Sequence, residues 1–263
     1  MDLGLKDKVA LVAASSKGLG KATALSLAGE GCRVTMCARG TDVLAEAAEE
    51  VRQATGAKVL EVVCDVTDGA AITAAFEKTE QELGNVDVLV VNAGGPKAGA
   101  FDDLTDDDWM EAYQLTHLSA VRMIRRALPH MRAAKWGRIV AIESSSVKQP
   151  VMNLHLSNGI RAGLVGYFKS ISDELAKDNI TINTVLPGLY LTDRILDNQK
   201  AIAERTGEAL ADRLEMIKNN IPMGRFGEPR ELADMISFLA SERGSYVTGA
   251  VIQVDGGTTR GNF

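Results

Sequence analysis

The stretch KVALVAASSKGLG, residues 8–20, decides the fold of this chain. Its first half, Lys8 to Ala14, is almost entirely apolar, which is typical of a β-strand buried on both faces. Ser15-Ser16-Lys17-Gly18-Leu19-Gly20 follows and leads into a helical pattern. A strand, a glycine-containing turn and a helix form half of a βαβ unit, whose turn offers backbone N–H groups and a helix N-terminus to an anion. We expect a pyrophosphate there, and a simple tight turn is the alternative interpretation.

The end of the next predicted strand, Arg33 to Ala38, indicates which dinucleotide this turn would hold. An NAD site carries an Asp or Glu at this point, which binds the ribose 2′-hydroxyl. This chain has Arg39 after Ala38, so no carboxylate would repel a 2′-phosphate and Arg39 can pair with one. Lys17 adds a second cation from the first turn. We therefore predict NADP(H) as the cofactor, the alternative being that both cations are solvated surface residues.

Strands and helices alternate along the rest of the chain. This order predicts a single-domain α/β fold, a doubly wound (Rossmann) parallel sheet with right-handed crossovers. The predicted helices cover 41–55, 68–83, 106 to about 134, 153 to about 177 and 228–239, and the remaining strands cover 58–63, 86–91, 138–142, 180–186 and 250–254. Residues 1–263 form the domain, and the polar stretch 193–219 is expected to be a substrate lid. It carries no recognisable specificity motif.

Composition excludes several classes of protein. The chain has 263 residues, 46% of them hydrophobic, which suffices for one well-buried core. A formal charge of −6 argues against a nucleic-acid partner. Three cysteines without ligand-like spacing suggest reduced thiols in the cytoplasm and no metal site. Neither a membrane-spanning run nor a leader pattern is apparent, so we expect no membrane partner.

Short motifs follow the later strands: Asp65-Val66, Asn92-Ala93-Gly94, Ser144, Pro187-Gly188 with Thr192, Gly224-Arg225-Phe226-Gly227-Glu228-Pro229 and Asp255-Gly256-Gly257. In this order and spacing, together with the Ser15–Gly20 turn, they resemble the short-chain dehydrogenase/reductase family over nearly the whole chain. The 3-oxoacyl-(acyl carrier protein) reductase-like branch is the most similar. The resemblance implies a seven-stranded sheet with helices on both faces, a tetramer, and hydride transfer between NAD(P)H and a carbonyl or alcohol.

The resemblance also assigns residues to the cofactor. The implied cofactor-binding set is Ser15, Ser16, Lys17, Gly18, Leu19, Gly20, Arg39, Asp65, Val66, Asn92, Ala93, Gly94, Arg161, Pro187, Gly188 and Thr192. Two motifs depart from the family pattern: the turn that normally opens with Thr-Gly here opens with Ala13-Ala14, and Asn-Asn-Ala-Gly is Val91-Asn92-Ala93-Gly94. Alanine does not take a positive φ without cost, so we expect a changed entry into the turn.

The catalytic positions implied by the resemblance depart further. The family serine is Ser144, and the helix asparagine that relays protons falls at Thr116. The catalytic tyrosine is replaced by Ser157 and the lysine by Arg161. An aliphatic hydroxyl is a much weaker acid than a phenol, so Ser157 is a poor proton donor on its own. Arg161 keeps a positive charge that can hold the cofactor ribose, but it cannot titrate.

Three other side chains could supply the proton. His155 lies two residues before Ser157, and histidines in general titrate close to neutral pH. Lys148 follows the triple serine 144–146, and Tyr190 lies just past Pro187-Gly188. For each, an ordinary structural role is the alternative, and a water between Ser144 and Ser157 is a fourth possibility.

These observations predict an atypical NADP(H)-dependent short-chain oxidoreductase acting on a carbonyl or alcohol. Ser144 would polarise the substrate oxygen, Ser157 would occupy the donor position and Arg161 would hold the ribose. Two alternatives stay open: an NADP(H)-binding protein with little redox turnover, acting as a sensor or oligomeric partner, and a non-redox enzyme on the same fold. Apolar residues around two helices, 106–134 and 153–177, predict a homotetramer.

Overall fold

The apolar runs of the sequence form a parallel sheet in the computed structural model, which describes residues 2–261. Within these residues the sheet has seven strands in the order β3-β2-β1-β4-β5-β6-β7, which is the strand order of a doubly wound fold extended by one strand. The strands are β1 (Val9–Val12), β2 (Arg33–Ala38), β3 (Val59–Val63), β4 (Val88–Val91), β5 (Gly137–Ile142), β6 (Ile180–Pro187) and β7 (Val251–Val254). The predicted fold class is therefore confirmed.

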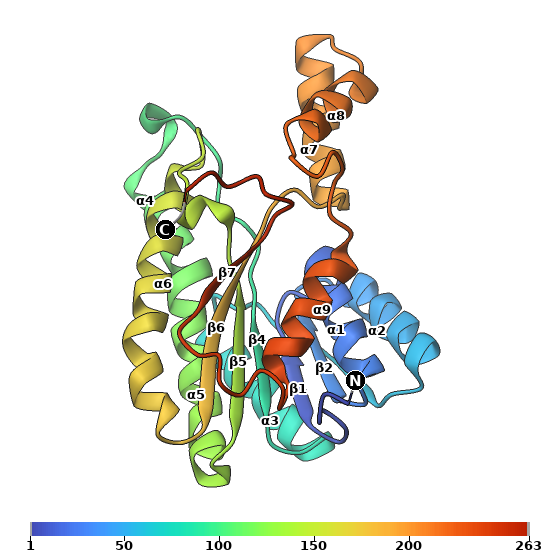
Figure 1. Cartoon of the computed structure of the whole chain (residues 1–263), viewed down its shortest axis with the longest axis vertical. Helices are drawn as coiled ribbons and strands as arrows, with labels where there is room; N and C mark the ends of the chain where they lie inside the picture. The colour runs from blue at the N-terminus through green and yellow to red at the C-terminus, as the bar shows by residue number, and fades with distance from the viewer. Residues whose placement is uncertain (1, 262–263) are drawn as a thin grey trace.

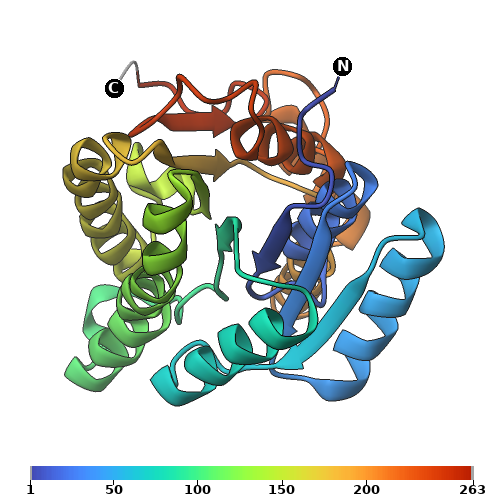
Figure 2. The same cartoon turned by 90° about the horizontal axis from the view of Figure 1, so that it is seen from below.

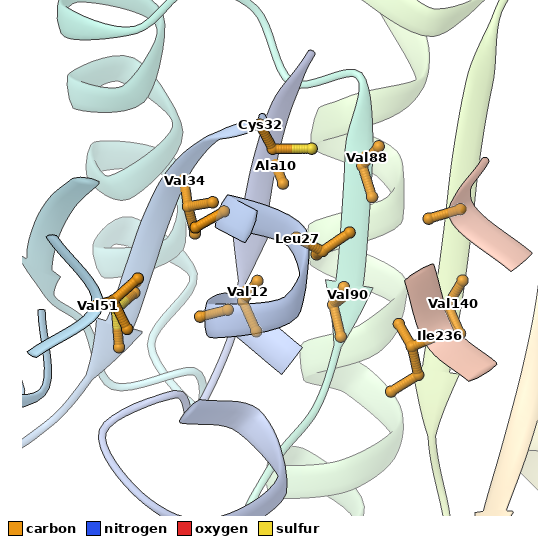
Figure 3. Close-up of a cluster of buried hydrophobic side chains, with 14 of the residues drawn as sticks. Ala10, Val12, Leu27, Cys32, Val34, Val51, Val88, Val90, Val140 and Ile236 are labelled. Carbon is orange, nitrogen blue, oxygen red and sulfur yellow. The ribbon is translucent and has the colours of Figure 1, made fainter. Parts of the chain in front are cut away.

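Helices cover both faces of the sheet (Figure 1; Figure 2). One face carries α1 (Gly18–Gly29), α2 (Thr41–Thr55) and α9 (Pro229–Ala240), and the other carries α3 (Gly69–Glu82), α5 (Ser119–Ala134) and α6 (His155–Ala176). Strand β1 shows why the sequence runs are continuously apolar. Ala10 and Val12 pack into the core beside α1 and α9 (Figure 3), whereas Leu11 packs into the core beside α3 and α5.

The predicted helix from 106 to 134 is not continuous. It consists of α4 (Asp106–Ala112), a π-helical segment η2 (Tyr113–Leu118) and α5. Thr105 begins α4 with a capping box, because its side chain and that of Asp108 bond each other's backbone N–H groups. The hydrophobic periodicity does not predict the π segment, because a single turn is too short to show a period of its own.

The predicted lid forms two helices, α7 (Asp193–Thr206) and α8 (Leu210–Asn219). Gly207 ends α7 in the left-handed conformation, with φ 72°. Figure 1 shows both helices projecting beyond the carboxyl ends of the strands, away from the main body. Among residues 2–261, no helix combines the length and the apolar character that a membrane span would need.

Candidate active site

The turn after β1 contains a backbone conformation that is unexpected for its residue, Ala14. Ala14 has φ 48°, so it adopts the left-handed conformation, which is uncommon for a residue with a Cβ. The Asn92 side chain, from the end of β4, donates to the Ala13 carbonyl (3.2 Å) and to the Ala14 carbonyl (3.3 Å). A Cβ on Gly20 would lie 3.0 Å from the Ala14 carbonyl carbon, so a glycine is needed there. Asn92 and the space at Gly20 therefore hold Ala14 in this conformation.

Some residues of this turn bond the neighbouring strands, and others are exposed to solvent. The buried Ser15 hydroxyl donates to the Val12 carbonyl (2.9 Å) and accepts from the Cys37 N–H (3.0 Å), which ties β1 to β2. Lys17 is exposed and caps α1 without a side-chain hydrogen bond to the helix. The first N–H groups of α1 therefore face the carboxyl edge of the sheet, where an anion can accept from them.

Arg39 extends from the end of β2 on the same edge and is exposed, whereas Ala38 before it is buried. The positive charge of Arg39 acts on the carboxylate of Asp65, which follows β3. The Asp65 carboxylate accepts from the Thr67 N–H (2.9 Å) and hydroxyl (2.8 Å), and these bonds, together with the Arg39 charge, lower its pKa. Within residues 2–261, neither Arg39 nor Lys17 forms an ion pair.

The loop after β6 returns to the glycine turn. Gly188 donates to the Val254 carbonyl (3.1 Å), and a Cβ at Gly188 would lie 2.7 Å from the Asp255 Cα. Thr192 then lies over the first turn of α1, since its methyl carbon would be 3.6 Å from a Cβ at Gly18. The remaining predicted cofactor residues lie at the same edge. Pro187 ends β6, Leu19 lies in the first turn of α1, and Ser16, Val66, Ala93 and Gly94 follow strand ends.

At the other end of this edge, two serine hydroxyls meet, one from the short η3 turn (Ser145–Val147) that follows β5 and one from α6. Ser157 is buried, and its hydroxyl lies 3.3 Å from that of Ser146. Ser144, the predicted partner of the substrate oxygen, instead caps the short η3 turn (Ser145–Val147) by accepting from the Ser146 N–H (3.2 Å). Sequence reasoning missed Ser146, although the run Ser144-Ser145-Ser146 offered the signal.

Arg161, one helical turn after Ser157, forms a buried ion pair. Its guanidinium donates to the Glu143 carboxylate over 2.6 Å, and both side chains are less than a tenth exposed. Burial raises the pKa of Glu143, and the Arg161 charge opposes that rise. Glu143 is a second residue that the sequence analysis missed. Only its place directly before Ser144, at the end of a buried strand, could have pointed to it.

Thr116 lies in the π-helical segment η2 (Tyr113–Leu118). It is 3% exposed, and its hydroxyl has no hydrogen-bond partner among the described residues. A buried hydroxyl without a partner costs free energy, and π-helical turns occur frequently at functional sites. Thr116 therefore remains a candidate for holding a bound group.

The other predicted proton donors fare differently. Tyr190 is buried, its hydroxyl donates to the Val254 carbonyl (2.8 Å), and burial raises its pKa to about 12. Tyr190 is therefore a structural residue, and its proposed role as a donor is wrong. His155 is the first residue of α6 and is half-buried, as is Lys148 at the end of η3. Both stay near the two serines along the chain.

Comparison with known proteins places this geometry in context. The family model described as enoyl-(acyl carrier protein) reductase matches residues 13–259. A 3-oxoacyl-[acyl-carrier-protein] reductase from Aquifex aeolicus is 34% identical over 259 residues, which is 98% of this chain and 99% of that protein.

Two solved structures are similar over their whole length. L-Sorbose reductase from Gluconobacter frateurii, complexed with NADPH and L-sorbose, matches with a TM-score of 0.95 and 34% identity over 99% of this chain and 100% of that one. An NADPH-bound short-chain oxidoreductase from Pseudomonas aeruginosa, described as containing an atypical catalytic centre, matches with a TM-score of 0.89 and 33% identity over 98% and 99%.

Proposed function

Because the chain belongs to the short-chain dehydrogenase/reductase family, we propose that it is an NADP(H)-dependent oxidoreductase acting on a carbonyl or alcohol substrate through an atypical Ser/Arg site. One arrangement carries the proposal. The open N-terminus of α1 and Arg39 lie along the same edge of the sheet as the paired Ser146 and Ser157 hydroxyls. Ligands of doubly wound sheets bind along this edge.

The residues present fit NADP(H). The N–H groups at the start of α1 would hold the diphosphate, and Arg39 with Lys17 would hold the 2′-phosphate. Both cations are exposed and lack an ion-pair partner within residues 2–261, so neither would have to break a contact first. When bound, the nicotinamide supplies or accepts a hydride. The NADPH complexes of the sorbose reductase and the Pseudomonas oxidoreductase support this assignment.

The chain's own residues would position the substrate oxygen. Ser157 stands at the donor position, and Ser146 orients its hydroxyl from 3.3 Å away. Ser144 would donate its hydroxyl hydrogen to the substrate oxygen while its oxygen still accepts from the Ser146 N–H. Arg161 would offer the N–H groups not used by Glu143 to the cofactor ribose. Thr116, whose buried hydroxyl has no partner within residues 2–261, would bind a water or a group of the substrate.

Titration with NADPH, followed by an assay of its oxidation against a broad panel of carbonyl compounds, tests the proposal. We expect dissociation in the micromolar range or tighter and oxidation of NADPH with at least one carbonyl class. The second candidate function, a cofactor-binding protein with little turnover, is favoured by the weak acidity of Ser157 and predicts tight binding without oxidation. Product formation without consumption of NADPH would instead indicate non-redox chemistry on the same fold.

We also propose a homotetramer in the cytoplasm. Trp109, Met110 and Tyr113 on the α4 and η2 segments are 41%, 57% and 39% exposed, and β7 is a half-exposed edge strand. Cys32, Cys37 and Cys64 are all free thiols, which suits a reducing compartment. Light scattering at micromolar concentration would give the tetramer mass, and a monomer mass would contradict the assembly. The unit 193–219 is proposed to act as the lid over the substrate.

A further inference from the structure

The buried ion pair of Glu143 and Arg161 is fixed to the sheet as well as to the helix that carries Arg161. Glu143 directly follows β5, and its N–H donates to the Val185 carbonyl of β6 over 3.0 Å. Its carboxylate accepts from Nη1 of Arg161 over 2.6 Å, and the two side chains are 3% and 7% exposed, respectively. The guanidinium is therefore tied to a strand end that backbone pairing holds in place.

Arg161 uses only one of its three side-chain nitrogens for this bond. Within residues 2–261, Nε and Nη2 of Arg161 form no hydrogen bond. Neither is among the fully enclosed side-chain atoms that lack a partner, which are Arg33 Nε, Thr116 Oγ1 and Thr181 Oγ1. Both nitrogens therefore reach space that a ligand can occupy. Because a guanidinium is planar, fixing one N–H also fixes the directions of the others.

Stability alone does not account for two charges at this depth. Ions removed from water gain little net free energy from pairing, and apolar side chains of similar volume often stabilise a fold as well or better. The other residues near Arg161 on the buried face of α6 are uncharged: Leu156, Ser157, Ile160 and Leu164. The charge and direction of this guanidinium therefore need a reason other than packing.

We infer that Glu143 is a positioning residue, which orients Arg161 so that its free N–H groups meet the ribose on the nicotinamide side of NADP(H). This inference rests on the proposed function, which assigns Arg161 to the cofactor ribose. Ser157 lies one helical turn before Arg161, and hydride transfer requires the nicotinamide beside the substrate oxygen that Ser157 would bind. Arg39 and Lys17 then remain for the 2′-phosphate on the adenosine side.

The competing role for Glu143 is a structural brace between β5 and α6. Two probes separate the roles: NADPH, and adenosine 2′,5′-bisphosphate, which carries the adenosine half and the 2′-phosphate but no nicotinamide ribose. Loss of a brace would disturb the site for both ligands, whereas loss of positioning affects NADPH alone. Isothermal titration of each ligand into the full-length protein needs no turnover.

The variants form a double-mutant cycle with a matched control. Glu143→Gln keeps the length of the side chain and removes its charge. Arg161→Met is made alone and together with Glu143→Gln, so that any effect of Glu143 independent of Arg161 becomes visible. Glu80→Gln is the control, because the Glu80 carboxylate pairs with Arg126 over 2.7 Å between α3 and α5.

We expect Arg161→Met to weaken NADPH binding about tenfold, as loss of a hydrogen bond from a charged donor implies. Glu143→Gln should weaken it roughly threefold to tenfold, because the guanidinium must then be ordered on binding. In the Arg161→Met background, Glu143→Gln should change NADPH binding by less than about twofold. Adenosine 2′,5′-bisphosphate should bind every variant within about twofold of the wild type, and Glu80→Gln should match the wild type with both ligands.

Three results would overturn the inference. Equal losses for both ligands in Glu143→Gln would make Glu143 a brace. Unchanged or tighter NADPH binding in Glu143→Gln would show that Arg161 needs no orientation from its carboxylate partner. A loss of NADPH binding that persists when Arg161 is already replaced would show that Glu143 does not act through Arg161.

A failure of the proposed function would look different. If the wild type binds NADPH but oxidises it with no carbonyl compound, the redox function fails, yet the ratio of the two affinities still tests Glu143. If NADPH is oxidised and Glu143→Gln weakens both ligands equally, the function stands and the inference fails. A wild type that binds neither ligand would overturn both.

Discussion

The two ends of the sheet's carboxyl edge differ in how their charges are used. At the cofactor end, Lys17 and Arg39 are exposed and form no ion pair within residues 2–261. At the catalytic end, Glu143 and Arg161 are buried and already paired over 2.6 Å. The cofactor end can thus bind an external anion. At the catalytic end, the positive charge of Arg161 is already paired with Glu143, and arginine cannot titrate as a lysine would.

This contrast explains why binding is easier to argue than turnover. An exposed cation loses little hydration when a phosphate arrives and gains charge-assisted hydrogen bonds. A buried ion pair is different, because its two charges stabilise each other and the arginine cannot give up its proton. The chemistry at the catalytic end must therefore depend on the serine hydroxyls and on groups that reach them.

The largest expected effect comes from breaking the buried pair. Glu143→Ala leaves the Arg161 charge buried without a partner, so we expect the free energy of unfolding to fall by about 3–5 kcal/mol. Denaturant titration measures this loss. Glu80→Ala is the matched control, since Glu80 pairs with Arg126 where both side chains are roughly 30% exposed, and about 1 kcal/mol or less should be lost.

A double variant separates charge from packing at this pair. Glu143→Ala combined with Arg161→Met removes both charges and should recover most of the stability lost by Glu143→Ala alone. If the double variant is as unstable as the single one, packing rather than charge explains the loss. In that case the buried charges of Glu143 and Arg161 would not distinguish the catalytic end from the cofactor end.

The next effect tests whether the catalytic end is limited by its proton donor. Ser157→Tyr places a phenol where the fold expects one, and a positioned general acid contributes roughly a hundredfold or more to rate. Activity on simple ketones should rise by about that factor, measured as NADPH oxidation at saturating cofactor. Ser170→Tyr, on an exposed face of the same helix, should change nothing. Loss of native turnover would show instead that Ser157 itself takes part in the chemistry.

A smaller effect is expected at the cofactor end. Arg39→Ala should weaken NADPH binding about tenfold or more, because one charge-assisted contact of roughly 1.5–3 kcal/mol is lost. NADH binding should stay unchanged, since NADH has no 2′-phosphate. Arg230→Ala removes an exposed charge from α9 and serves as the control. Equal dissociation constants for NADPH and NADH in the wild type would contradict the role of both cations.

The sequence predicts most of the fold because apolar runs and glycine turns are local signals. Strand β2 and helix α2 have the predicted bounds, and the other strands differ by one or two residues at their ends, with Lys8–Ala14 shortened to Val9–Val12. The π segment was missed because it is a single turn, too short to show a period of its own.

The site was less predictable because its contacts join distant residues. Glu143 pairs with a residue 18 positions away, and Ser146 meets a hydroxyl 11 positions away. No local pattern specifies such partners, which depend on how α6 packs against the end of β5. Tyr190 shows the reverse error, since a tyrosine near the expected site is bonded to the Val254 carbonyl instead.

The smallest expected effect concerns the strained entry to the glycine turn, at the cofactor end. Ala14 has φ 48°, and a left-handed conformation costs an alanine roughly 1–2 kcal/mol. Ala14→Gly removes this strain but gives the unfolded chain more freedom, which costs about 0.4–1 kcal/mol. We therefore expect a net gain of about 0.5–1 kcal/mol in the free energy of unfolding, or roughly 2 °C in Tm.

Calorimetry on Ala14→Gly and on Ala13→Gly measures this difference directly. Ala13 has no positive φ and is fully buried, so its replacement by glycine removes packing and adds only unfolded-state freedom. That variant should be destabilised, opposite in sign to Ala14→Gly. If both variants lose stability equally, Ala14 carries no strain, and the backbone of the turn is relaxed as it stands. NADPH affinity should be nearly unchanged in Ala14→Gly, because Asn92 still holds the turn through the carbonyl groups of residues 13 and 14.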